Sequence, residues 1–118
     1  MQLKSCPSTP NCVSSQSTDP AKRMDPIAYS GALDDAHATL LRVLDRSRVE
    51  VVESHELYVH AVFTTRLMRF KDDVEFLFDP DASVIHFRSA SRVGRSDFGA
   101  NRSRMESLAR ELESAWHE

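Results

Sequence analysis

The residues best suited to chemistry gather first in the stretch FKDDVEF, residues 70–76. Side chains alternate along a β-strand, so Asp73 and Glu75 are expected on one face, near His60 and His86 from neighbouring strands. A close carboxylate pair beside a histidine can perform acid–base catalysis or hold a metal ion. The alternative is a cross-strand lattice of salt bridges. We favour the lattice, because an adjacent arginine lowers the pKa of a carboxyl group and makes it a poorer proton carrier.

The second stretch is RSASRVGRSDFGANRSR, residues 88–104, which carries five arginines and one acidic residue in a chain of net charge −3. Its glycines have P-loop spacing, but Ala100 and Asn101 stand where a P-loop needs lysine and serine or threonine. What remains is a polar loop that leads into a helix N-terminus, where backbone donors and arginines could bind an anion. The structural alternative, which we favour, is that these arginines first neutralise the protein's own carboxylates.

The elements that position these residues begin with two predicted hairpins. The β-rich stretch 49–65 divides into strands near 49–53 and 57–65 around the polar tripeptide Ser54-His55-Glu56. In the second hairpin, within residues 73–89, the turn is DPDAS.

The register of the second hairpin follows from its apolar side chains. Pairing Phe78 with Ile85, and therefore Phe76 with Phe87, keeps the apolar set on one face, whereas a one-residue slip would mix the two faces. On the other face, the register then places Glu75 opposite Arg88 and Leu77 opposite His86.

Helical spacing predicts two helices. One covers 31–46, with acids at its start that complement the helix dipole. The other lies within residues 103–118, where Ser103 and Glu106 have the spacing of a capping box. The prediction is one α+β domain over residues 31–118, with a four-stranded antiparallel sheet and two helices on one face.

Residues 1–30 form an extended arm, rich in Ser, Thr and Pro, that we expect to be irregular and packed on the domain. The spacing of Cys6 and Cys12 fits neither a C-x-x-C redox motif nor the cysteine doublets of zinc sites. We favour a disulfide, which would contribute roughly 2 kcal/mol and requires an oxidising compartment. Two unrelated reduced thiols are the alternative.

Several classes of protein and site are not expected from the sequence. The chain of 118 residues has no apolar run near the ~18 residues of a membrane span. Nucleic-acid binders are more often basic overall, and the only aromatic residue within the basic stretch is Phe98. There is no H-x-x-x-H metal spacing and no G-x-S-x-G nucleophile elbow. We expect no nucleic-acid partner, no metal and no cofactor.

Three segments together resemble the domain-of-unknown-function family 1499 over nearly the whole chain: PNCVSSQ (residues 10–16), FKDDVEF and the arginine-rich stretch. The tyrosine-bearing strand at residues 58–61 also fits the pattern. The family has no assigned activity. Its members are frequently exported, lipid-anchored or sent to the thylakoid lumen, so the resemblance implies an extracytoplasmic location, in agreement with the disulfide. No signal peptide is visible before Cys6, and a cytoplasmic location stays open.

The resemblance draws the polar residues of the three segments into one candidate ligand-binding site. Its members are Asn11, Ser14 and Ser15 in the arm, Asp73 and Glu75 in the acidic strand, and Arg88, Ser91, Arg92, Asp97, Asn101 and Arg104 in the arginine-rich stretch. We expect a non-catalytic binding module for a small anionic or polar ligand or a partner protein. One alternative is an enzyme that uses Asp73 or Glu75 for acid–base or metal-assisted hydrolysis, and another is a purely structural or assembly protein.

Overall fold

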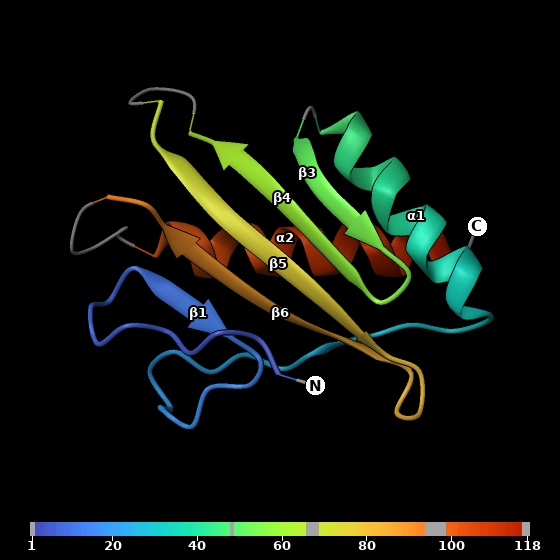
Figure 1. Ribbon diagram of the computed structural model, residues 1–118, viewed down its shortest axis with the longest axis horizontal. Coiled ribbons are helices and arrows are strands. Elements are labelled where there is room, and N and C mark those ends of the chain that lie inside the picture. Colours follow the sequence, from blue (N-terminus) through green and yellow to red (C-terminus); the bar gives the residue numbers. More distant parts are fainter. Residues whose placement is uncertain (1, 48, 66–68, 94–98, 117–118) are drawn as a thin grey trace.

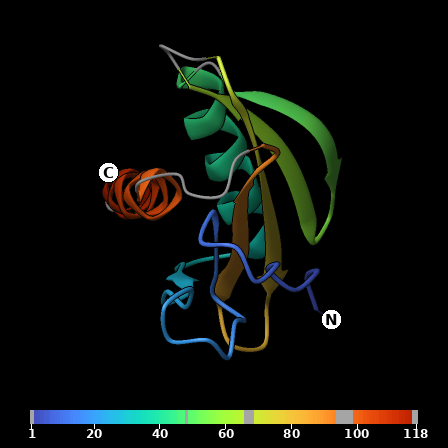
Figure 2. The ribbon, with the colours of Figure 1, turned by 90° about the vertical axis from the view of Figure 1, so that its left-hand side faces the viewer.

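Two helices cover one face of an antiparallel sheet in a computed structural model that describes residues 2–47, 49–65, 69–93 and 99–116 (Figures 1 and 2). The strand order is β1-β6-β5-β4-β3, and β2 also pairs with β6. In chain order the elements are β1 (Cys12–Ser14), β2 (Ile27–Ala28), α1 (Leu33–Arg46), β3 (Glu50–His55), β4 (Tyr58–Thr64), β5 (Lys71–Asp79), β6 (Val84–Ser91) and α2 (Ala100–Trp116).

The register predicted for β5 and β6 is confirmed. Phe78 pairs with Ile85, and Glu75 pairs with Arg88. The large apolar side chains of this face are fully buried between the sheet and the helices, as the predicted pattern requires.

The turn of the first hairpin lies later in the sequence than predicted. Ser54 and His55 belong to β3, and the turn is the two-residue step Glu56-Leu57, because His55 pairs directly with Tyr58. Two-residue loops are the commonest connection between antiparallel strands.

The sheet has six strands and not the predicted four, because the N-terminal arm contributes two. Two short segments of the arm, β1 and β2, pair antiparallel with β6, so this part of the chain is not irregular throughout. The arm thereby supplies partners for backbone groups of β6 that a bare sheet edge would leave unpaired. The disulfide between Cys6 and Cys12 is present, as predicted.

The helix boundaries differ from the predicted ones. Gly31 has a φ of 84°, in the left-handed region, and α1 begins two residues later, at Leu33. The start of α2 at Ala100 precedes the predicted capping box, because the Ser103 N–H donates to the Gly99 carbonyl over 3.0 Å. Ser103 therefore lies in the first turn of α2, and the prediction that it caps the helix was wrong.

Candidate functional site

The acids of FKDDVEF pair with arginines of the 88–104 segment. Strand alternation sends Asp72 to the helix-covered face and Asp73 to the opposite, outer face. Arg104 Nη2 lies 2.7 Å from Asp72 Oδ2, whereas Arg92 donates from Nε and Nη2 to the two oxygens of Asp73 over 2.8 and 2.9 Å. With Arg88 beside Glu75, three arginines of the segment pair with the protein's own acids, as expected, whereas Arg102 donates to the carbonyls of Ala21 and Arg23.

A buried polar cluster ties the start of α2 to the helix-covered face of the sheet. Asn101 is fully buried, and its Oδ1 accepts hydrogen bonds from Ser89 Oγ (2.5 Å) and Arg104 Nη1 (2.9 Å). Its Nδ2 donates to the Asn11 carbonyl and to Ser91 Oγ, each over 3.1 Å. These contacts join β6, α2 and the residue just before β1, so the cluster contributes to the packing of the fold.

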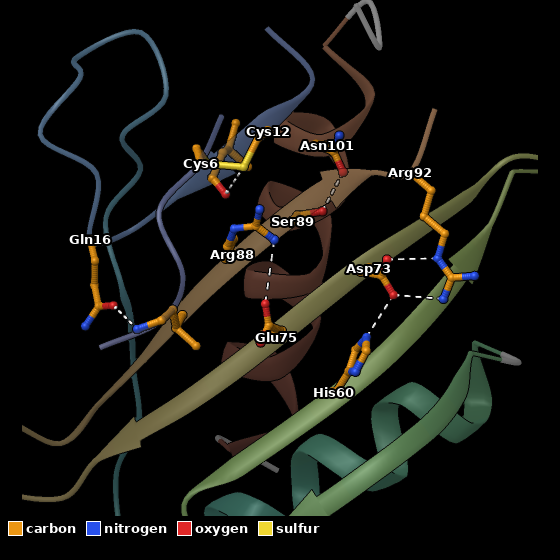
Figure 3. A network of polar contacts seen from close by, with 12 residues as sticks. Cys6, Cys12, Gln16, His60, Asp73, Glu75, Arg88, Ser89, Arg92 and Asn101 are labelled. Carbon is orange, nitrogen blue, oxygen red and sulfur yellow. Dashed lines mark hydrogen bonds and ion pairs between the residues drawn. A yellow bond between two sulfur atoms is a disulfide. The ribbon is translucent and has the colours of Figure 1, made fainter. Parts of the chain in front are cut away.

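The outer polar face, which we define as Tyr58, His60, Asp73, Glu75, Arg88 and Arg92, lies on the side of the sheet away from both helices. Figure 3 shows Asp73 between His60 and Arg92, and Arg88 pointing toward Glu75. His60 Nε2 is 2.8 Å from Asp73 Oδ1. The Tyr58 hydroxyl donates to Glu75 Oε2 over 2.5 Å.

The candidate residues therefore fall on two faces of the sheet. Asp73, Glu75, Arg88 and Arg92 meet on the outer polar face, where strand alternation and the register had predicted the first three. Ser91, Asn101 and Arg104 lie on the helix-covered face, where the buried polar cluster uses their side chains. The position of Asp97 lies outside the described residues.

The two serines of the arm contact the backbone. Ser14 is 3% exposed, and its Oγ accepts the Gln16 N–H over 3.1 Å. Ser15 Oγ accepts the Phe87 N–H over 2.9 Å and lies 3.1 Å from His86 Nδ1. His86 thus contacts the arm and not the carboxylates beside which it was expected.

Charge interactions set the proton affinity of the outer polar face. The hydrogen bonds from Arg92, together with His60, lower the pKa of Asp73 to about 2, although partial burial opposes the shift. Asp73 in turn raises the pKa of Arg92. Burial raises the pKa of Tyr58, and the hydrogen bond to Glu75 adds to this shift. Asp73 is therefore ionised at neutral pH and a poor proton carrier.

Among the described arginines that pair with a carboxylate, Arg88 has the least complete interactions. The residue is 9% exposed, and its Nε is buried without a hydrogen-bond partner. Its ion pair with Glu75 spans 3.6 Å, clearly longer than the 2.7–2.8 Å of the pairs made by Arg104 and Arg92. A buried guanidinium donor is thus left unsatisfied on the outer polar face.

A second buried cation, Lys22, was missed by the sequence analysis. It is 8% exposed, and its Nζ donates to the Thr9 carbonyl over 2.5 Å. Lys22 lies in an irregular loop, where no periodicity assigns a side chain to a face. Among the described ranges, no group of three His, Cys, Asp or Glu side chains could hold a metal ion.

Two short strands from the arm, a four-stranded meander and two helices on one face define a small α+β protein with an acid–arginine lattice around β5. The chain belongs to the family described as Protein of unknown function (DUF1499), whose model matches residues 2–112. None of the curated proteins matches it. No helix in the described part of the chain is long and apolar enough to cross a membrane.

The low pKa of Asp73 predicts a specific pH dependence of stability. Because the folded pKa, about 2, lies below the ordinary 3.8, the ionised group stabilises the fold above about pH 4, and this contribution is lost as the pH falls toward 2. We expect Asp73→Asn to lower the free energy of unfolding by about 1–2 kcal/mol near pH 6. Urea denaturation should show most of that difference gone near pH 2.

The matched control is Asp45→Asn, on the exposed surface of α1. This variant should change stability by less than about 0.5 kcal/mol at either pH. A deficit of Asp73→Asn that stays constant across this pH range would contradict the assigned role of Arg92.

Proposed function

We propose that this protein is a small non-catalytic binding module, with the arm packed on one domain, and that its outer polar face takes up a small carboxylate ligand. The observation that carries the proposal is the buried Arg88 Nε without a partner. Leaving a buried donor unsatisfied costs about 1–3 kcal/mol, and more when the donor is charged. An acceptor that reached this donor would recover that free energy, and because Arg88 Nε is fully covered, binding requires the side chains over it to move aside.

The shape of the guanidinium supports a carboxylate as the ligand group. Arginine presents its donors in a rigid planar fork, which matches the two oxygens of a carboxylate. Glu75 occupies this position only loosely, at 3.6 Å, and its other oxygen already accepts from Tyr58. The neighbouring His60 is partly exposed and offers a further polar contact on the same face.

Binding is favoured over the enzymatic alternative by the partners of the two carboxylates. Asp73 is held bidentately by Arg92, and its pKa of about 2 is far from that of a general base working near neutral pH. Glu75 lies between the Tyr58 hydroxyl and Arg88. The arrangement therefore favours a face that recognises charge over one that transfers protons.

An extracytoplasmic location belongs to the same proposal, because disulfides persist in oxidising compartments. The Cys6–Cys12 bond is consistent with it. We expect no free thiol when protein purified from its native source, without reductant, is denatured and treated with a thiol reagent. Two free thiols per chain would contradict this part of the proposal.

A thermal-shift series with acetate, succinate and citrate tests the binding function. At least one of them should raise the melting temperature of the wild type by 2 °C or more, since a ligand that binds only the folded state stabilises it. Arg88→Met should abolish the shift. Circular dichroism and urea denaturation check that this variant folds, because removing one partner of a largely buried ion pair is destabilising, although Glu75 keeps its hydrogen bond from the Tyr58 hydroxyl.

The matched control is Arg42→Met, on the exposed surface of α1. It should keep the full shift. The proposal fails if none of the three carboxylates shifts the wild type, or if Arg88→Met responds as the wild type does.

A further inference from the structure

A cavity of about 470 Å³ lies within the N-terminal arm, between residues 2–8 and the loop that follows β1. This volume is within the range of about 300–1,000 Å³ typical of small-molecule pockets. Hydroxyl groups dominate the polar part of its wall, which includes Ser5, Ser8, Ser14, Ser17 and Thr18.

The cavity wall also holds the buried cation Lys22. An ammonium group has three donors, and the described contacts of Lys22 Nζ use one of them, toward the Thr9 carbonyl. None of the ion pairs among the described residues includes Lys22. Burying a charge without a counter-charge is costly, so an anion that binds beside Lys22 would be stabilised by it.

The other charged residues of the cavity wall do not supply a counter-charge for Lys22. Lys4 adds a second positive charge and is exposed. Asp19 is exposed, and its Oδ1 accepts the Ala21 N–H over 2.9 Å. The carboxylate of Asp19 therefore serves the local turn and does not pair with Lys22.

We infer that the arm cavity is a second ligand site, which binds the phosphate or sulfate group of a small molecule through Lys22. Lysine acts as a compact point charge for such groups, and hydroxyl donors from several directions suit a tetrahedral oxyanion. Arg88, by contrast, presents a planar fork on the outer polar face. The two sites thus share no residue, and this inference does not depend on the proposed function.

The disulfide should control this site. Thr9, which accepts from Lys22, lies inside the loop closed by the Cys6–Cys12 bond, and Cys6 and Ser8 form part of the cavity wall. Reducing the disulfide would release the part of the cavity wall at Cys6 and Ser8, and also the Thr9 carbonyl that positions the ammonium group of Lys22. Reduction should therefore weaken binding without any change to Lys22 itself.

Isothermal titration calorimetry of the intact, oxidised protein with inorganic phosphate, sulfate and glycerol 3-phosphate tests the inference. We expect binding of the free anions, and glycerol 3-phosphate should bind at least as tightly because the cavity has room for the attached group. Lys22→Met and the reduced protein should each bind at least 10-fold more weakly. Lys71→Met, at the exposed start of β5, and Arg88→Met should bind as the wild type does.

A measurement on the wild type keeps the test valid even if Lys22→Met does not fold. Phosphate should shift the backbone amide NMR signals of Ser14, Ser17 and Thr18, and leave that of His60 unchanged. The inference is overturned if the wild type binds neither free anion at millimolar concentration, if glycerol 3-phosphate binds much more weakly than phosphate, or if a folded Lys22→Met keeps wild-type affinity. Loss of carboxylate binding in Arg88→Met, with phosphate binding retained, separates this site from the proposed one.

Discussion

Strand alternation at the adjacent pair Asp72-Asp73 is the constraint on which the arrangement of charges depends. One carboxylate must point into the helix-covered face and the other must point to the outer face. An adjacent cation stabilises each of them. Arg104 reaches Asp72 from the first turns of α2, and Arg92 reaches Asp73 from the segment after β6. Asp72 and Asp73 of β5 thereby hold the start of α2 and the segment that follows β6.

The acids and arginines largely pair with one another. The cations that remain incompletely paired therefore mark the places where we propose that the protein binds a ligand. Arg88 has only a distant carboxylate and a buried donor without a partner. Within the described part of the chain, the ammonium group of Lys22 contacts one acceptor, the Thr9 carbonyl. Both are nine-tenths buried, so water screens their charge poorly. The arm brings both positions close to the sheet edge at β1, where Ser14 pairs with Arg88 and lines the cavity of Lys22.

The sequence predicts the central meander and the acid–arginine pairing well, because a period of two assigns every side chain of β5 and β6 to a face. It does not predict β1 and β2, since strands of three and two residues show no periodicity. The candidate site predicted from the sequence combined residues that lie on two faces of the sheet. Adjacency in sequence does not show that Asn101 points into the core beneath α2. Lys22 was missed because its burial depends on a loop that only tertiary contacts define.

Double-mutant cycles on two ion pairs test the central claim most directly. The cycle of Asp72→Asn with Arg104→Met should give a coupling free energy of at least about 2 kcal/mol, since this pair is short and buried. The cycle of Glu75→Gln with Arg88→Met should give less than about 0.5 kcal/mol, because Arg88 is only loosely engaged. Equal coupling in the two cycles would show that Arg88 is fully committed to Glu75, and would contradict the account.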